Sequence, residues 1–200
     1  MNARRIFEWG GLAAGIVLIA FGIGAIAMGV DGRSTVRDSL KQEQIFFGDA
    51  TDPAVAEHAS QWAGDQVTTG DQARSFALVM REHTLGSTDG LTYAQMGRYQ
   101  SAANPNDPKG TNDEAAAAKD EAGAPISNGA RTIWVTETGL TTALNMSYMA
   151  EQLALFGVVV GIALLLTGTG LIILALAVLG GRLRERPEAA TRQQPAVAGH

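Results

Sequence analysis

The residues that decide the fold run from Leu153 to Gly181 and read LALFGVVVGIALLLTGTGLIILALAVLGG, without a single ionisable side chain. A transmembrane helix needs about 20 apolar residues to cross a hydrocarbon core of roughly 30 Å. This stretch is longer than that, and a basic cluster closes it at Arg182, Arg184 and Arg186. It predicts a membrane-spanning helix over residues 153–181.

A second apolar stretch, residues 10–30, follows Arg4 and Arg5 near the N-terminus. The polar segment between the two, residues 31–152, carries nine Lys and Arg against seventeen Asp and Glu, a net charge of −8. Lys and Arg beside membrane spans are retained on the cytoplasmic side. We therefore expect both termini in the cytoplasm, as a short lead over residues 1–9 and a disordered tail over residues 182–200.

The fold class that follows is an all-α membrane protein of the plasma membrane. Two antiparallel transmembrane helices would flank a mostly helical extracytoplasmic domain over residues 31–152. A cleaved signal peptide is the alternative for the first span, because Ala25-Ile26-Ala27 resembles a cleavage site. The apolar run of about 21 residues is longer than the usual signal-peptide core of 7–15 residues, which favours retention.

Composition and missing motifs restrict the possible functions. An acidic outer segment argues against nucleic acid, which needs clustered Lys and Arg. The chain has no cysteine, which excludes disulfides and thiolate metal sites. Neither span contains an ionisable residue, which argues against transport by this chain alone. Nucleophile-elbow, dinucleotide and P-loop motifs do not occur, so we expect no catalytic, cofactor-binding or metal site.

Glycines in both spans predict close helix packing. Small residues four positions apart let membrane helices approach each other. If the spans run antiparallel, residue numbers at equal depth sum to roughly 185, which sets Gly24 level with Gly161 and Gly15 level with Gly170. The packing candidates are Gly11, Gly15, Gly24, Gly157, Gly161 and Gly170. Homodimerisation through the same glycines is the alternative.

Capping and periodicity predict several helices in the outer segment. After a break at Asp31-Gly32, the expected helices cover residues 34–47, 53–63, 70–86 and 92–100. Residues 101–125 lack bulky apolar side chains, so we expect a mobile insertion, with an alanine-rich helix over residues 113–122. A final helix would begin near Ser127 and continue into the second span, with an irregularity at Gly139. A short strand over Ile133–Thr136 is the alternative.

Two outer histidines, His58 and His83, each follow a glutamate. A non-haem iron site needs two His and a carboxylate, but this spacing fits no compact ligand motif. His83 and Tyr93 are weak candidates for a shared ligand pocket. The alternative is that Gly86 and Gly90 end one helix and Tyr93 packs at the start of the next.

One further feature is the order of several short residue patterns along the outer segment, from Val36 to the start of the second span. Its elements are Val36-Arg37-Asp38-Ser39-Leu40-x-x-Glu43-x-Ile45, Ala63-Gly64-x-x-Val67, Gln72-Ala73, His83, Asp89-Gly90-x-Thr92-Tyr93-Ala94 and Leu140-x-Thr142-Ala143-Leu144. In this order the chain resembles an uncharacterised actinomycete family of small two-span membrane proteins, which implies two spans around an external helical segment. Many members carry the label aromatic ring-opening dioxygenase, which implies an iron site with two His. Only His83 belongs to the shared pattern, and His58 does not, so we do not carry catalysis over.

The leading functional hypothesis is a non-enzymatic interaction or accessory protein of the cell envelope. It would contact the lipid bilayer and either a membrane-protein partner or further copies of itself. A metal-dependent ring-opening dioxygenase using His83 and His58 is one alternative. An envelope sensor is the other.

Overall fold

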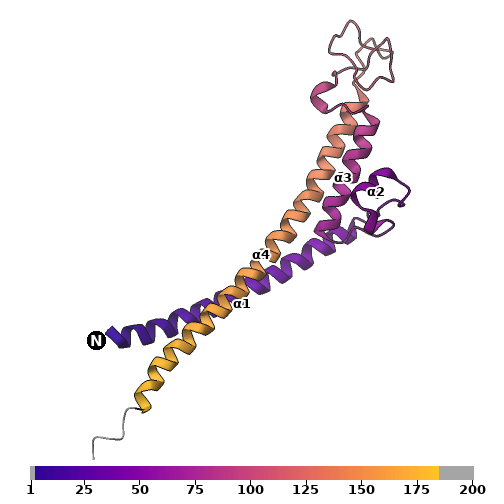
Figure 1. Ribbon diagram of the computed structural model, residues 1–200. Coiled ribbons are helices and arrows are strands. Elements are labelled where there is room, and N and C mark those ends of the chain that lie inside the picture. The colour runs from indigo at the N-terminus through magenta and orange to yellow at the C-terminus, as the bar shows by residue number, and fades with distance from the viewer. Residues whose placement is uncertain (1–2, 185–200) are drawn as a thin grey trace, which may run out of the picture. The chain divides into compact units, whose positions relative to one another are not determined.

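The computed structural model describes residues 3–184, with side chains described at residue 6 and over residues 9–177. Its elements in chain order are α1 (Ala3–Gln42), α2 (Pro53–His58), the 3-10 helix η1 (Ser60–Trp62), α3 (Gly70–Ser87), the 3-10 helix η2 (Tyr93–Gln95) and α4 (Gly129–Arg184) (Figure 1). Over the described residues there is no strand, only isolated β-bridges. The all-helical prediction is therefore confirmed.

The chain divides into two compact units, and both long helices contribute to each. The apolar unit contains residues up to Val30 and from Leu155 onward. The polar unit contains residues Asp31–Ala154, with α2, α3 and both 3-10 helices. Two helical segments, Trp9–Gln42 and Gly129–Ala177, are long and apolar enough to cross a bilayer, and the most apolar 18-residue windows within them have mean hydropathies of 2.3 and 2.6.

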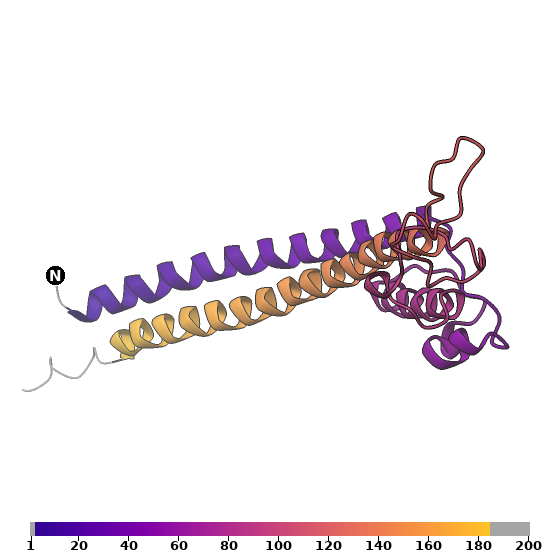
Figure 2. The same ribbon diagram turned by 90° about the horizontal axis from the view of Figure 1, so that it is seen from above.

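Close backbone contact between glycines packs the apolar unit. A Cβ built on Gly22 would lie 2.7 Å from the carbonyl oxygen of Gly161, and a Cβ on Gly161 would lie 2.7 Å from that of Gly22. Gly15 and Gly168 make the same reciprocal contact, seven residues away on each helix. Because real Cβ atoms do not approach oxygen this closely, only glycine allows this separation. Figure 2 shows α1 and α4 running along each other here.

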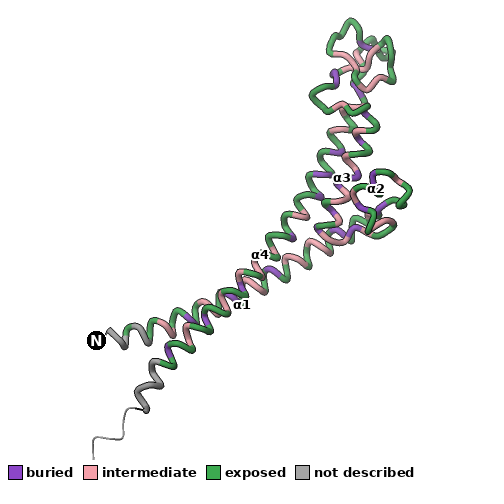
Figure 3. Tube along the Cα trace, viewed as in Figure 1, coloured by how far each residue is buried: buried purple, intermediate pink, exposed green. Residues whose placement is uncertain are grey.

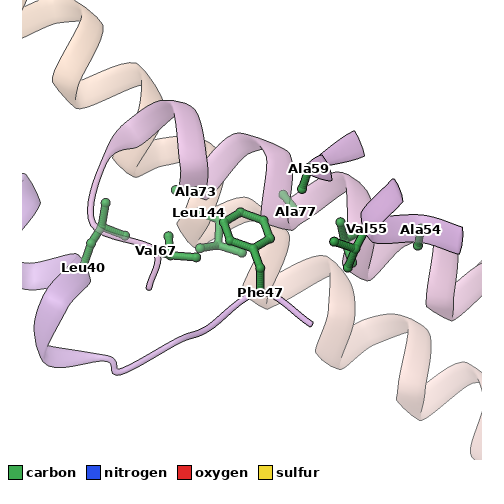
Figure 4. Close-up of a cluster of buried hydrophobic side chains, with 10 residues drawn as sticks. Leu40, Phe47, Ala54, Val55, Ala59, Val67, Ala73, Ala77 and Leu144 are labelled. Carbon is green, nitrogen blue, oxygen red and sulfur yellow. The ribbon is translucent and has the colours of Figure 1, made fainter. Parts of the chain in front are cut away.

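The polar unit has a small hydrophobic core where α2 and α3 pack on the long helices. Phe47 lies at its centre, stacked on Trp62 at 6.0 Å and edge-on to Phe76 at 5.4 Å between ring centroids. Val55 and Val67 are fully buried beside it. Several core positions are alanine, as Figure 4 shows, so α3 lies close to its neighbours. Along α4, Figure 3 shows buried positions recurring on one face.

Local sequence signals fix two helix starts in this unit. The side chain of Asp52 accepts a hydrogen bond from the Ala54 N–H, and Pro53 occupies the first turn of α2, as predicted. The side chain of Gln72 accepts from the Thr69 N–H at 3.1 Å and so completes a capping box at the start of α3. The sequence prediction began this helix correctly at Gly70 but did not recognise the box.

The predicted break at Asp31-Gly32 is wrong, because α1 continues to Gln42. A glycine inside a helix costs about 1 kcal/mol, which tertiary contacts can offset. Gly32 provides one such contact, since a Cβ built on it would lie 3.7 Å from the Cβ of Ala154. Ion pairs from Arg33 and Arg37, described below, provide others.

Other boundaries also differ from the prediction. The helix expected over residues 53–63 ends at His58 and is followed by a separate 3-10 turn, and the one expected over 92–100 is only the 3-10 turn η2. Residues 113–122 form no helix, because Asp113 and Asp120 accept hydrogen bonds from backbone N–H groups two residues ahead and stabilise turns instead. The alternative strand at Ile133–Thr136 is also wrong, since α4 is helical from Gly129 and passes Gly139 without interruption. The mobility expected of residues 101–125 stays a prediction.

Cysteine pairs can test the helix packing of the apolar unit, because the natural chain has no cysteine. A Cβ on Gly11 would lie 3.5 Å from the Cβ of Ala175, within the range that a disulfide bridges. We expect Gly11→Cys/Ala175→Cys to form an intramolecular disulfide under mild oxidation, detected by mass spectrometry of the monomer. The control is Gly10→Cys/Ala175→Cys, because a Cβ built on Gly10 would have no atom of the described residues within 4 Å to meet. Equal bridging in both variants would contradict this packing.

Candidate functional site

Glu151 joins three helices through a partly buried charge cluster. Its side chain is only 7% exposed, and its Oε1 accepts hydrogen bonds from Arg33 Nε at 2.8 Å and Arg37 Nε at 2.9 Å, both on α1. Its Oε2 accepts from the backbone N–H of Gly70, the first residue of α3, at 2.5 Å. The carboxylate therefore connects α1, α3 and α4 at one point.

The first turn of α3 can reach Glu151 only because residue 70 is glycine. A Cβ there would lie 2.9 Å from the Tyr148 Cα and 3.0 Å from Glu151 Oε2. The positive end of the α3 dipole also favours a carboxylate at this position. One turn further along α3, the Arg74 guanidinium lies 4.8 Å from the centre of the Tyr148 ring and secures the same helix pair.

The pKa of the Glu151 carboxyl reflects opposing effects. Burial raises it, but the hydrogen bonds from Arg33, Gly70 and Arg37 together lower it below its ordinary value. The carboxyl is therefore a stable anion in the folded polar unit. Its role is to hold helices together rather than to exchange protons.

A second buried carboxylate, Glu137, lies fourteen residues earlier on α4 and has a different environment. Its side chain is 3% exposed, and Arg81 Nε on α3 lies 3.2 Å from its Oε1. That pair lacks hydrogen-bond geometry, so Oε1 accepts no hydrogen bond from any described residue. Arg81 also lies 4.6 Å from the centre of the Trp134 ring. Glu137 is thus charge-paired but not fully hydrogen-bonded.

The outward face of α4 in the polar unit is uncharged. Between Thr132 and Leu153 the only charged residues are Glu137 and Glu151, and both are buried. Large apolar side chains are exposed along the same stretch, including Val135 at 57%, Met146 at 58% and Met149 at 63%. An exposed apolar face of this kind marks an interaction surface.

The structure separates His83 from Tyr93. His83 Nε2 lies 2.9 Å from Asp52 Oδ2 and lowers the pKa of Asp52, against a smaller opposing effect of burial. The Tyr93 ring instead lies 4.0 Å from the Arg131 guanidinium. The two residues line different depressions, so they do not form one pocket. Among the described residues, no group of three His, Asp or Glu side chains is arranged to hold a metal ion.

Of the six predicted packing glycines, four lie between α1 and α4. Gly11 faces Ala175, Gly15 faces Gly168, Gly161 faces Gly22, and Gly157 lies beside Ala25 and Gly29. The exceptions are Gly24 and Gly170, where an added Cβ would meet nothing within 4 Å in the part of the chain that the structure describes. The expected pairs Gly24–Gly161 and Gly15–Gly170 are therefore replaced by Gly22–Gly161 and Gly15–Gly168.

The sequence prediction missed these pairs because it set residue numbers at equal depth to sum to roughly 185, whereas both contacting pairs sum to 183. The contacts repeat every seven residues, at Gly15 and Gly22 on α1 and at Gly161 and Gly168 on α4. It also missed Arg33, Arg37 and Glu151. Their signal was present, because residue numbers that sum to about 185 set both arginines level with the lone glutamate just before the second span.

Comparison with protein-family models, curated proteins and solved structures gave no match to this chain. The resemblance to actinomycete two-span proteins accordingly stays a prediction. Function has to be inferred from the geometry of the chain itself.

Glu151→Gln should destabilise the polar unit by about 1.5 kcal/mol, because it replaces charge-assisted hydrogen bonds from two partly exposed arginines by neutral ones. The measurement is chemical unfolding in detergent, followed by tryptophan fluorescence. Asp38→Asn is the matched control, since Asp38 forms an exposed pair with Lys41 at 3.4 Å and should change stability little. Equal effects of the two variants would contradict the central role of Glu151.

The lowered pKa of Glu151 also makes the free energy of unfolding depend on pH. A carboxyl with a depressed folded-state pKa contributes stability that is complete above its ordinary value of 4.5 and is lost as the pH falls through the folded value. The natural chain should therefore lose more stability below pH 4.5 than Glu151→Gln does. Parallel stability curves for the two proteins in acid would count against this assignment.

Proposed function

We propose that the chain is a two-span membrane protein of the cell envelope that works without catalysis, by helix–helix association. The observation that carries this proposal is the exposed, uncharged apolar face of α4 in an otherwise acidic unit. A surface of this kind is unfavourable in water and is stabilised when another apolar helix covers it.

Exposure of the apolar helices supports membrane insertion. The most apolar window of each is only 17% buried, unlike the core helix of a soluble protein. The side chains of Phe21 and Leu166 are 69% and 71% exposed, and contact with lipid chains would shield this apolar surface from water. Gly15 contacts Gly168 and Gly22 contacts Gly161, so the residue number increases along α1 while that of its contact on α4 decreases. This order supports an antiparallel pair.

Basic residues next to the spans support an orientation with both termini inside and the polar unit outside. An Ala115→Cys variant should react with a membrane-impermeant maleimide on intact cells, because Ala115 is exposed in the polar unit. A cysteine at Ala190 should react only after the membrane is opened. The reverse pattern would contradict this orientation.

The exposed residues of α4 form a seam that suits a helical partner. The seam consists of Val135, Gly139, Thr142, Met146, Met149 and Leu153, all exposed. Its spacings alternate between four and three residues, the repeat by which two helices pack along their length. Methionine at two of these positions adapts to the shape of a partner.

A second copy of this chain is the occupant we propose for the seam. In a twofold dimer with its axis along the membrane normal, α4 meets α4 of the other copy in parallel, so the seam faces itself. Because the seam has no charge, this contact pairs no like charges directly. The net charge of −8 on residues 31–152 should still oppose association at long range, so higher salt should strengthen the dimer.

Single cysteines on the cysteine-free chain test this dimer. Met149→Cys should form an interchain disulfide in native membranes, whereas Thr35→Cys, exposed on α1, should not. Met146→Lys/Met149→Lys should convert the dimer to monomer in mild detergent, measured by light scattering. A monomeric natural chain without a Met149→Cys cross-link would contradict self-association and would leave a different membrane protein as the occupant.

A further inference from the structure

A depression of about 340 Å³ lies where the start of α4 meets residues 93–98 of the polar unit. Two arginines, Arg98 and Arg131, line it together with the hydroxyl-bearing residues Ser127 and Thr132. Its lining contains no Asp or Glu. Guanidinium and hydroxyl groups are the donors that bind oxyanions in proteins, so this lining suits an anion.

The two arginines of this depression have no ion-pair partner in the part of the chain that the structure describes, although the unit carries seventeen Asp and Glu. Elsewhere in the same unit Arg33, Arg37 and Arg81 each pair with a buried glutamate. Two positive charges therefore line one depression, and no described carboxylate neutralises either of them.

A buried asparagine joins the two segments that carry these arginines. Asn128 is only 5% exposed, and its side-chain amide donates to the carbonyl oxygen of Gly97 at 3.0 Å. Its backbone N–H donates to the carbonyl oxygen of Arg98 at 2.9 Å, and its side-chain oxygen accepts from the Ala130 N–H at 3.0 Å. The backbone of Arg98 is thus fixed beside the first turn of α4, which carries Arg131. A ligand would not have to order this backbone on binding.

The number of charges selects the kind of anion. An arginine guanidinium is always charged in proteins, so the depression carries two positive charges. A carboxylate would neutralise only one of them, whereas a phosphate monoester carries about −1.5 to −2 charges at pH 7. Guanidinium groups also bind phosphate oxygens through two parallel hydrogen bonds. A long polyanion suits the unit less well, because the net charge of −8 on residues 31–152 repels it.

We propose that this depression binds a small organic phosphate monoester, with its phosphate group on Arg98 and Arg131. The volume is at the lower end of the range for small-molecule sites, about 300 to 1,000 Å³. The site does not require the proposed dimer, because all its charged and hydroxyl groups come from one chain. Val135 is the one lining residue that also belongs to the seam.

The source of the phosphate is a soluble ester rather than a lipid headgroup. The phosphodiester of a common phospholipid carries one negative charge and would leave one arginine without a partner. Position gives the same answer, because about 35 Å of helix separates Arg131 from Ala154, the last residue of the polar unit on α4. The depression therefore lies at the end of the unit that is remote from the residues leading into the apolar helices.

Calorimetric titration of the full-length chain in phosphatidylcholine nanodiscs tests this site, with glucose 6-phosphate as the probe. We expect one binding site per chain. Glucose 6-sulfate has the same sugar but a single negative charge, and it should bind at least tenfold more weakly. Equal affinities for the phosphate and the sulfate would overturn the proposal, as would a chain that binds neither glucose 6-phosphate nor inorganic phosphate.

Single arginine variants locate the binding. Arg98→Gln and Arg131→Gln should each weaken binding of glucose 6-phosphate at least tenfold, because each leaves one positive charge in the depression. Arg74→Gln is the matched control, since Arg74 also lies over a tyrosine ring, that of Tyr148, but outside the depression. It removes the same charge and should bind like the natural chain. If Arg131→Gln does not fold, the exposed Arg98 decides alone, and unchanged binding in Arg98→Gln would overturn the site.

Lipid composition separates the two sources of phosphate. Phosphatidic acid is a lipid with a phosphate monoester, and phosphatidylglycerol is an anionic lipid with a phosphodiester. Glucose 6-phosphate should bind equally well in nanodiscs that contain equal amounts of one or the other. A tenfold weaker affinity in the phosphatidic acid nanodiscs would show that the lipid occupies the site and would overturn the assignment to a soluble ester.

Discussion

Three separate helices meet at the carboxylate of Glu151, and the polar unit depends on this contact. Arg33 and Arg37 approach from α1, and the first N–H of α3 approaches from the other side. The small hydrophobic core around Phe47 includes residues of the same three helices, α1, α3 and α4. The charge cluster therefore helps to position the helices that form this core. A buried carboxylate is favourable only when several donors surround it, so the contact specifies one arrangement of the three helices.

The two buried glutamates of α4 show how the same residue type takes different roles. Glu151 and Glu137 are fourteen residues apart, so a repeat of seven places both on the face that packs against other helices. Glu151 accepts hydrogen bonds from two arginines and a backbone N–H of the chain itself, so its role is structural. Glu137 has an arginine but no hydrogen bond at Oε1, and a groove lies beside it. The difference lies in the neighbours, not in the sequence near either residue.

Local signals in the sequence predicted the parts of the fold that depend on neighbouring residues. Asp52-Pro53 marked the start of α2, and the periodicity after Ser127 indicated that the second span continues a long outer helix. The local signals gave wrong predictions where contacts between distant residues determine the secondary structure. Asp31-Gly32 looks like a helix break, but tertiary contacts carry α1 through it. Residues 113–122 have helical composition, yet aspartate turns and bridges to distant backbone organise them differently.

The candidate sites were harder to predict, because their residues are far apart in the chain. Glu151 lies 118 positions from Arg33 and 81 from Gly70, so no local motif joins them. Matching residues at equal membrane depth would have paired the arginines with Glu151, and a seven-residue spacing would have found Gly22 and Gly168. The buried Oε1 of Glu137 has no sequence signal, because its environment depends on the geometry of one arginine.

A double-mutant cycle between Glu151 and its two arginines tests the central claim most directly. The cycle compares the free energies of unfolding of Glu151→Gln, of Arg33→Gln/Arg37→Gln and of the variant that combines all three changes. If the cluster acts as one unit, the combined variant should be about as stable as Glu151→Gln alone, with a coupling above about 1 kcal/mol. Additive losses would show that the charges act independently and would contradict the account.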